Sequence, residues 1–463
     1  MTINHAKVSS GIRGLDTILD GGYPAGTAAL LTGGPGSGKT VFGLSFIHGA
    51  LAAGEGAVMV TCDERPERLL NYMDALGMAG SRALDEGRLQ LLDMRPGADE
   101  QVAGAYDLGV IRLRIESALA ATGATRLVID SLDNLQIALA GDRLRSEIVA
   151  LFEWLRDAGL TTLVTLAAST GAGVMHRFEE YASDCVIHLS QQLRERLMTR
   201  YLRVVKMRGA GHGTNEYPFL LDGGGVTILP VTGTELKAAA PTTRTTTGVA
   251  GLDAMMGGAG YLDGSTIMVS GSAGTGKSLL SASLLHAALQ AGRKAALISL
   301  EESPQEIRRN LRAVGIDLAP FVESGALEMY SMRSVEMGLE SHLIYISKRV
   351  DQAAVQFIVI DPISALADLG SPLQVKMMLM RFTHHLKARG VSVLLTELLP
   401  DGARGTSTMN ISSLNDVWIR TRQVESGGAV KRVIQVVKAR GGASSGDLRE
   451  FTIGADGIRI EGD

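Results

Sequence analysis

The chain has little cysteine and no long hydrophobic run. Its 463 residues include two cysteines, Cys62 and Cys185, in separate strand-like segments. Two such thiols do not make a disulfide framework, so we expect reduced, buried cysteines and a cytoplasmic protein. No apolar run reaches the roughly 18 residues that suggest a membrane-spanning helix, and we expect no signal peptide ahead of Val8. The composition therefore argues against a disulfide-stabilised secreted domain and against a membrane protein.

The chain also lacks an excess of positive charge and is poor in aromatic side chains. Its formal net charge is −4, and aromatic residues make up 4% of the sequence. A net acidic chain has no general attraction for nucleic acid or anionic lipid. The sequence contains no basic helix–hairpin segment and no zinc-ligand spacing. Nucleic acid is therefore not an expected partner.

What the chain does contain, twice, is a glycine-rich nucleotide loop. Residues 33–40 (GGPGSGKT) and 271–278 (GSAGTGKS) both fit G-x-x-x-x-G-K-[ST]. A G-x-x-G-L-D segment precedes each loop, and an acidic pair, an apolar strand ending in aspartate and a K-x-R-G segment follow it. The separation between equivalent positions is 238 residues for the loops and acidic pairs, 231 for the aspartates and 232 for the K-x-R-G lysines. One order at nearly one offset indicates a tandem domain duplication.

The duplication predicts two domains, residues 1–236 and 248–463, joined by a linker at 237–247. The linker is rich in threonine and broken by Pro241, which is typical of an extended, exposed connection. Each half is long enough for one well-buried core. In both halves short apolar runs alternate with helical segments, which together with the two glycine loops predicts an α/β fold of tandem P-loop domains, each a mostly parallel sheet flanked by helices. The expected strands are 28–32, 57–60, 126–129, 162–166 and 266–270, and the expected helices are 40–53, 146–158 and 278–291.

The two glycine loops predict two ATP sites. Glycine lets backbone N–H groups approach phosphate oxygens, and the loop lysine reaches the β- and γ-phosphates. A glycine turn without a nucleotide is the alternative, and two complete matches between a strand and a helix weigh strongly against it. The predicted ATP contacts at the loops are Gly36, Ser37, Gly38, Lys39, Thr40 and Val41 in the first copy and Gly274, Thr275, Gly276, Lys277, Ser278 and Leu279 in the second.

A Mg²⁺ site is predicted beside each loop. The hydroxyls of Thr40 and Ser278 would ligate the ion, and Asp130 and Asp361 would hold a water of its shell. An aspartate that only caps the next turn is the alternative, and its recurrence in both halves favours the metal. Glu301 completes the predicted magnesium residues.

The acidic pairs are the candidate catalytic residues. Asp63-Glu64 and Glu301-Glu302 stand where RecA-like ATPases carry the glutamate that orients or deprotonates the nucleophile. Pairs of acids are usually solvated turns, and only the position of these pairs relative to the glycine loops favours catalysis.

Alternating cations occur late in each half. Lys206-Met207-Arg208 and Lys438-Ala439-Arg440 would place both positive side chains on one face of a strand, which suits contact with the γ-phosphate of a neighbouring subunit. Exposed cations on an edge strand are the alternative, and the residues alone favour it slightly.

Together these residues resemble the KaiC family, the tandem RecA-fold ATPases and autokinases of the cyanobacterial circadian clock. The resemblance covers almost the whole chain from about Val8, and it includes residues 179–184, 206–212, 216–219, 301–303 and 308–310. It implies a homo-hexamer of two stacked rings, ATP and Mg²⁺ as cofactors, and in-trans nucleotide contacts by the K-x-R segments. It also adds His212 and Arg432 to the expected ATP-binding residues.

The resemblance selects one Ser-Ser pair as a modification site. Residues 411–416 (ISSLND) are similar to the second-domain segment that KaiC autophosphorylates, so Ser412 and Ser413 are the expected phosphorylation sites. Glu301 would be the base that serves them, and Asp63 is its first-domain equivalent.

The chain also departs from the family pattern. The first domain has Asp63 where the family has glutamate, and a shift near 1 Å can cost about 100-fold in rate, so we expect slower first-domain hydrolysis unless Glu64 takes over. The second domain has Ser444 in the region that matches His212. Only ten residues follow Ile453, so the tail that KaiA binds is not expected and KaiA is an unlikely partner; a KaiB-like partner of the first domain stays possible.

Two other functions remain open on the sequence. A RecA- or RadA-type DNA-dependent ATPase would share the fold and the ATP chemistry. The acidity and low aromatic content noted above argue against it. An ATP-driven signalling switch without kinase activity is compatible with Ser413 in place of the family threonine. The leading hypothesis is an ATPase and serine autokinase used for timing or signalling.

Overall fold

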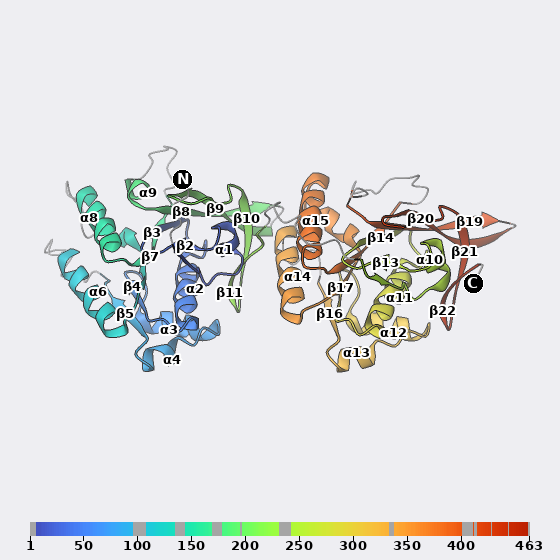
Figure 1. Ribbon diagram of the computed structural model, residues 1–463, viewed down its shortest axis with the longest axis horizontal. Coiled ribbons are helices and arrows are strands. Elements are labelled where there is room, and N and C mark those ends of the chain that lie inside the picture. Colours follow the sequence, from blue (N-terminus) through green and yellow to red (C-terminus); the bar gives the residue numbers. More distant parts are fainter. Residues whose placement is uncertain are drawn as a thin grey trace. The chain divides into compact units, whose positions relative to one another are not determined.

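The computed structural model describes residues 6–95, 108–134, 144–168, 178–194, 197–230, 242–332, 338–400, 411, 414–426, 428–442 and 444–461 (Figure 1). The chain divides into two units, Met1–Thr232 and Gly233–Asp463. Each unit contains a nine-stranded sheet and a two-stranded sheet. The tandem α/β architecture predicted from the sequence is confirmed.

The large sheet of the first unit has the order β11-β10-β9-β8-β3-β7-β6-β4-β5. The strands from β8 to β5 run parallel, and β9, β10 and β11 extend the sheet in antiparallel fashion. The elements of this unit are β1 (Lys7–Val8), α1 (Leu15–Ile18), β2 (Tyr23–Pro24), β3 (Ala28–Gly33), α2 (Lys39–Ala52), β4 (Ala57–Thr61), α3 (Pro66–Ala75), α4 (Gly80–Asp85), β5 (Leu89–Asp93), α6 (Leu108–Thr122), β6 (Arg126–Asp130), α8 (Leu144–Asp157), β7 (Thr161–Ala167), α9 (Phe178–Ala182), β8 (Cys185–Arg194), β9 (Leu197–Met207), β10 (Glu216–Asp222) and β11 (Gly225–Ile228).

The second unit repeats this topology strand for strand, in the order β22-β21-β20-β19-β14-β18-β17-β15-β16. Its elements are β12 (Arg244–Thr245), α10 (Ala250–Met255), β13 (Tyr261–Leu262), β14 (Thr266–Gly271), α11 (Lys277–Gln290), β15 (Ala295–Ser299), α12 (Pro304–Arg312), α13 (Ala319–Glu323), β16 (Leu327–Ser331), α14 (Leu339–Ala353), β17 (Phe357–Asp361), the 3₁₀ helix η2 (Ile363–Leu369), α15 (Pro372–Lys387), β18 (Ser392–Leu398), β19 (Val417–Ser426), β20 (Ala429–Ala439), β21 (Leu448–Gly454) and β22 (Gly457–Ile460).

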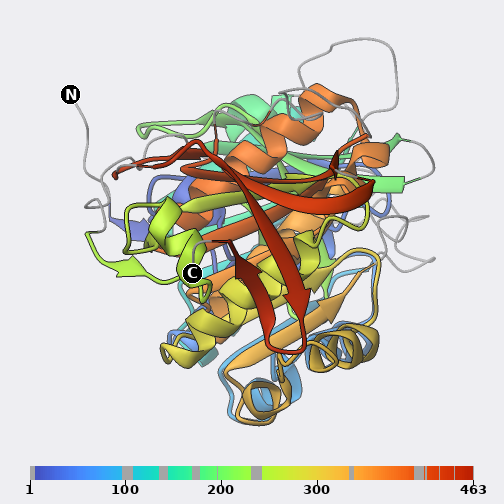
Figure 2. The same ribbon diagram turned by 90° about the vertical axis from the view of Figure 1, so that its right-hand side faces the viewer.

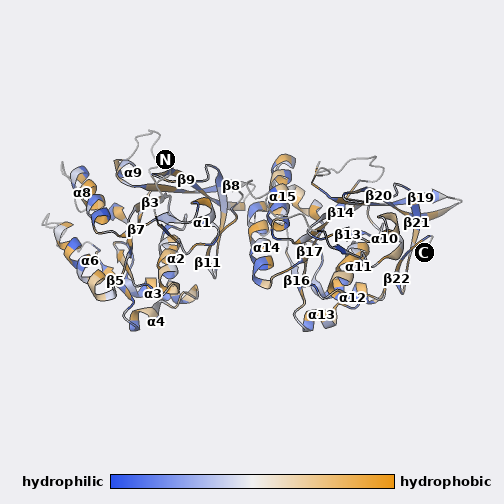
Figure 3. Ribbon diagram, in the orientation of Figure 1, coloured by the Kyte–Doolittle hydropathy of each residue, from blue (hydrophilic) through white to orange (hydrophobic). Residues whose placement is uncertain are grey.

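Helices cover both faces of each sheet. In the first unit α1, α2, α3 and α4 contribute to the core on one face, and α6 and α8 pack on the other. In the second unit α10, α11, α12 and α13 take the first role and α14 and α15 the second, with β22 packed against α11 (Figure 2). Figure 3 shows both hydrophobic and hydrophilic residues along the helices α8 and α14, and the residues that α8 buries are apolar. Central strands such as β3 are buried along their whole length, so they read as short continuous apolar runs.

The predicted elements agree closely with the observed ones. Each predicted strand or helix end lies within two residues of the observed end. Both cysteines are free and buried, as expected, and burial raises the pKa of the Cys185 thiol to about 12.

The end of the predicted linker differs from an exposed connection. Arg244–Thr245 forms β12, which pairs with β13 inside the second unit, and the side chain of Thr247 is fully buried. Thr247 donates a hydrogen bond to Asp253, so this stretch is held by the helix that follows it. The last residues of the predicted linker, 244–247, therefore belong to the second unit.

Candidate functional site

The first glycine loop connects the buried strand β3 to α2. Gly36 and Gly38 have φ values of 71° and 101°, in the left-handed region that favours glycine. A Cβ at Gly38 would lie 2.8 Å from Leu221 Cδ1, so a side chain there would displace Leu221 and would be strained at this φ. The Lys39 ammonium donates to the Gly33 and Gly34 carbonyls at 2.8 and 3.2 Å. The loop therefore has the backbone form and the cation that phosphate binding requires.

A hydroxyl and a carboxylate meet beside this loop. Thr40 Oγ1 donates to Asp130 Oδ2 at 2.8 Å, and Thr165 Oγ1 donates to Asp130 Oδ1 at 2.5 Å. Burial raises the pKa of Asp130, and the two hydroxyl hydrogen bonds oppose that rise. Hard oxygen donors suit Mg²⁺, which in nucleotide sites is held by one or two protein groups together with phosphates and water. The residues fit the ion, and the part of the chain that the structure describes holds no cluster of three or more His, Cys, Asp or Glu that would suggest another metal site.

A cavity of about 560 Å³ gathers the predicted first-site residues. Of the predicted residues it brings together the glycine loop, the magnesium pair and one acid, namely Gly36, Gly38, Lys39, Thr40, Val41, Asp63 and Asp130. It also includes residues that the sequence interpretation did not select, namely Ser131, Asp133, Asn134, Ala167 and Leu221. Ser37 is buried within the loop.

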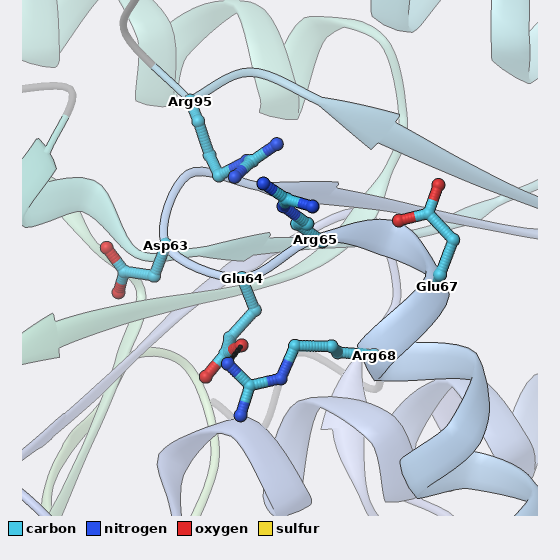
Figure 4. Close-up of a pocket in the computed structure, with 6 residues that line it drawn as sticks. All are labelled: Asp63, Glu64, Arg65, Glu67, Arg68 and Arg95. Atoms are coloured by element: carbon cyan, nitrogen blue, oxygen red, sulfur yellow. Dashed lines mark ion pairs between the residues drawn. The ribbon is translucent and has the colours of Figure 1, made fainter.

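The two acids of the first pair point in different directions (Figure 4). Asp63 lines the loop cavity, whereas Glu64 forms an ion pair with Arg68 at 3.1 Å. Glu64 and Arg68 line a neighbouring hollow of about 440 Å³, and Asp63 borders both this hollow and the loop cavity. The Glu64 carboxylate in Figure 4 points to Arg68, and the Asp63 carboxylate points away from the arginines. Asp63 is thus the acid of this pair that faces the loop.

The second glycine loop has the same form. Gly274 and Gly276 have φ values of 72° and 90°, and the Lys277 ammonium donates to the Ser272 carbonyl at 2.7 Å. Thr275 Oγ1 donates to the same carbonyl at 2.8 Å. Burial lowers the pKa of Lys277, opposed by the negative charges of Asp361 and Glu301.

The second acidic pair has a different electrostatic setting. Burial raises the pKa of Glu301, the charges of Asp361 and Glu302 raise it further, and Lys277 lowers it. Asp361 accepts a short hydrogen bond from Thr396, the counterpart of the Thr165 contact to Asp130. Ser278 is exposed and Leu279 is half-buried at the start of α11.

Two glutamine side chains reach the loops from equivalent strands. Gln191 Nε2 of β8 donates to the Gly36 carbonyl at 2.5 Å, and Gln423 Nε2 of β19 donates to the Gly274 carbonyl at 3.5 Å. Arg432, one of the predicted ATP-binding residues, donates from Nε to the Gly274 carbonyl at 3.2 Å. Arg432 therefore lies against the second loop of its own domain.

The K-x-R cations contact their own domains. The Lys206 ammonium donates to the Glu180 and Ser183 carbonyls, each at 2.7 Å, and Arg208 Nη2 donates to the Tyr181 carbonyl at 2.7 Å. Both side chains thus meet one segment, as expected for cations on one face. Burial lowers the pKa of Lys206, and so does Arg208.

The second K-x-R segment repeats this arrangement. Lys438 Nζ donates to the Asn415 carbonyl at 2.6 Å, and Arg440 Nη1 lies 3.5 Å from Asp416 Oδ1. Of the residues between the cations, Met207 is buried and Ala439 is half-buried.

Three predicted residues are not among those that line the described sites. His212 is half-buried and does not line the cavity around Lys39. Ser412 and Ser413 lie outside the described residues. Their neighbours Ile411 and Leu414 pack in the apolar core that α14 and α15 cover.

The sequence interpretation missed two residues of the first site. Ser131 and Asn134 both donate hydrogen bonds to Asp63. The repeat gave no signal for them, because the offset of 231 residues pairs them with Pro362 and Ala365, which have no donor in their side chains.

The fold and the two loops define the class of the molecule: a tandem P-loop ATPase with two RecA-like domains. A family model described as "ATPase: KaiC" matches residues 8–233 and 245–463. The circadian clock protein KaiC2 of a Synechocystis species is 35% identical over 460 residues, covering 98% of this chain and 81% of the relative. The circadian clock oscillator protein KaiC of Synechococcus elongatus is 32% identical over 463 residues, covering 98% and 89%. The chain belongs to the KaiC family of ATPases, as the sequence predicted.

The structure also bears on membrane association. In the ranges that the structure describes, no helix has the length and apolar character needed to cross a membrane.

Proposed function

We propose that the protein hydrolyses ATP at the first site and transfers phosphate from ATP to its own Ser412 or Ser413 at the second. The observation that carries the proposal is the repetition of the loop site, in which each loop lysine donates to a loop carbonyl and each strand-end aspartate accepts from a threonine. At the second site burial and the charges of Asp361 and Glu302 raise the pKa of Glu301. A carboxylate that holds a proton more readily than usual is suited to general base catalysis.

The protein groups have separate tasks in this proposal. Lys39 and Lys277 bind phosphate oxygens, and the loop N–H groups orient the chain of phosphates. Thr40 with Asp130, and Ser278 with Asp361, would hold Mg²⁺, which neutralises charge that develops on the phosphates. Asp63 orients the attacking water at the first site.

At the second site the acceptor is a serine hydroxyl. Its oxygen forms a bond to the γ-phosphorus of ATP while the bond from that phosphorus to the β–γ bridging oxygen breaks, and ADP leaves. Glu301 takes the hydroxyl proton. Lys277 binds the phosphates throughout the reaction, so its substitution removes ATP binding and leaves the acceptor serine in place.

We propose a homo-hexamer in which the K-x-R segment of one subunit reaches the nucleotide of the next. Lys206, Arg208 and Lys438 would exchange part of their contacts with carbonyls for contacts with phosphate, and Arg440 would exchange its approach to Asp416. The names of the relatives support a role in timing, and a KaiB-like protein is a candidate partner of the first domain.

The proposal is tested by incubating the pure protein with Mg·ATP and mapping phosphorylated residues by mass spectrometry. We expect phosphate on Ser412 or Ser413 in the wild type and in Lys39→Ala, and none in Lys277→Ala. Lys39→Ala is the matched control, since it removes the equivalent lysine of the other domain. Native mass spectrometry of each sample reports the assembly.

Other outcomes would assign another function. Retained ATP hydrolysis without phosphoserine would favour a switch that lacks kinase activity. Stimulation of hydrolysis by single- or double-stranded DNA would favour a DNA-dependent ATPase.

A further inference from the structure

A side chain outside the P-loop motifs holds the acid of the first site. Asn134 Nδ2 donates to the Cys62 carbonyl oxygen at 2.9 Å and makes a short hydrogen bond to Asp63 Oδ1. Ser131 Oγ donates to the other carboxylate oxygen of Asp63 at 3.0 Å. Both oxygens of Asp63 are therefore bound from the segment that follows β6.

That segment is itself anchored to the sheet. The backbone N–H of Ala167, at the end of β7, donates to Asp133 Oδ2 at 2.7 Å. The N–H of Cys62 donates to the Asp130 carbonyl at 2.7 Å. Asn134 thus connects the turn after β4 to a segment that two neighbouring strands hold in place.

The second domain repeats the two anchoring contacts, because the N–H of Leu398 donates to Ser364 Oγ at 3.2 Å and the N–H of Leu300 donates to the Asp361 carbonyl at 2.9 Å. Among the residues that the structure describes there, the two donors to the acid have no counterpart. The repeat places Pro362 and Ala365 at the positions of Ser131 and Asn134, and neither side chain can donate a hydrogen bond. The acid of that domain is Glu301, which is one methylene longer than Asp63. The shorter acid and the two donors occur together in one domain, and the longer acid occurs without them in the other.

We propose that Asn134 is a positioning residue for ATP hydrolysis at the first site, where it fixes the Asp63 carboxylate in the orientation that serves the attacking water. Asp63 itself is exposed, so without a partner its side chain would sample several rotamers. Two fixed donors restrict it to one. A misplacement of about 1 Å can cost about 100-fold in rate, so a short acid depends on such support more than a long one does.

This inference rests on the proposed role of Asp63. The experiment uses the full chain carrying Lys277→Ala, so that ATP hydrolysis reports the first site. In that background we compare Asn134→Ala, Asn134→Asp, Asp63→Glu, and Asp63→Glu combined with Asn134→Ala. Asn71→Ala is the matched control, because Asn71 is an exposed amide on α3 outside the loop cavity.

We expect Asn134→Ala to lower kcat by about 10- to 100-fold with KM changed by about twofold or less. Asn134→Asp keeps the shape of the side chain and loses the donor, so it should lower kcat at least as much. In the Asp63→Glu background the same Asn134→Ala change should cost about twofold or less, because that site then matches Glu301 beside Ala365. Asn71→Ala should leave both constants unchanged.

A loss of kcat from Asn134→Ala that is equal in the Asp63 and Asp63→Glu backgrounds would overturn the proposal, and so would a rise in KM with unchanged kcat. Melting temperatures of all variants separate misfolding from misplacement. Failure of the underlying function has its own signature: Asp63→Asn would hydrolyse ATP as fast as the Lys277→Ala parent.

Discussion

The two nucleotide sites of this chain use one scaffold and differ in how each holds its acid. Both loops join a buried strand to a long helix, and both put a lysine on loop carbonyls and a threonine on the strand-end aspartate. At the first site Asp63 accepts two hydrogen bonds. At the second, burial and neighbouring carboxylates raise the pKa of Glu301. The parts that bind phosphate are retained, and the parts that handle the nucleophile have diverged.

The residues that follow the two acids, Glu64 and Glu302, also differ in their surroundings. Glu64 is paired with Arg68, one turn along α3, at 3.1 Å. The repeat offset places Glu306 at the position of Arg68, where it belongs to a capping box with Ser303 at the start of α12. Among the residues that the structure describes, Glu302 has no ion pair to match that of Glu64 with Arg68, and its charge acts on Glu301. In the first domain Arg68 pairs with Glu64, whereas in the second domain the charge of Glu302 acts on Glu301.

The largest expected effect comes from removing the acid that faces each loop. In the Lys277→Ala background, Asp63→Asn should lower ATP hydrolysis by about 10²- to 10⁴-fold, the usual contribution of a general base. Glu64→Gln should change it by less than about threefold, because Glu64 is turned to Arg68. Steady-state release of phosphate measures both.

The reverse pattern would break the comparison. If Glu64→Gln abolished hydrolysis and Asp63→Asn did not, the assignment of the two acids in the first domain would be exchanged. In the Lys39→Ala background, comparing ATP hydrolysis by Glu301→Gln with that by Glu302→Gln makes the same test in the second domain.

A smaller effect concerns pH at the second site. The raised pKa of Glu301 means that a base at this position is lost as the pH falls through a value above that of an ordinary glutamate. Glu302→Gln removes one of the charges that raise this pKa, so the acidic limb of the second-site rate should move to lower pH. We expect the shift to be larger at low salt than at high salt, because salt screens the charge of Glu302.

The measurement is ATP turnover against pH in the Lys39→Ala background, with and without Glu302→Gln. Glu323→Gln, an exposed acid at the end of α13, is the control and should leave the limb in place. A limb that moves to higher pH after Glu302→Gln would contradict the electrostatic account of Glu301.

The sequence predicted the elements of both loops and most residues around them, because their chemistry requires fixed residue types at fixed spacing. Lys39, Thr40 and Asp130 could be placed in one site from the motif alone. Asn134 could not, since its role depends on a contact across 71 positions of the chain. The different orientations of Asp63 and Glu64 could not be predicted either, because they depend on the ion pair between Glu64 and Arg68. Local rules find the groups that touch phosphate, and tertiary contacts decide how the remaining groups point.

The smallest expected effect concerns the K-x-R arginines within their own domains. Arg208 donates to the Tyr181 carbonyl and lies 3.5 Å from Asp184, and Arg440 lies 3.5 Å from Asp416. Both side chains are about half exposed, so Ala substitutions should each cost less than about 1 kcal/mol, or roughly 2–4 °C in melting temperature. Arg208→Ala should cost slightly more, because it also loses the bond to a carbonyl.

The chain offers a way to read the two domains separately, since its two tryptophans are Trp154 in the first and Trp418 in the second. Fluorescence melts of Trp154→Phe report the second domain, and those of Trp418→Phe report the first. Introducing Arg208→Ala or Arg440→Ala into each should shift only the melt of the domain that carries the substitution. A shift well beyond 4 °C in either domain would mean that the arginine stabilises the fold itself, and it would weaken the proposal that these cations are available to a nucleotide of the next subunit.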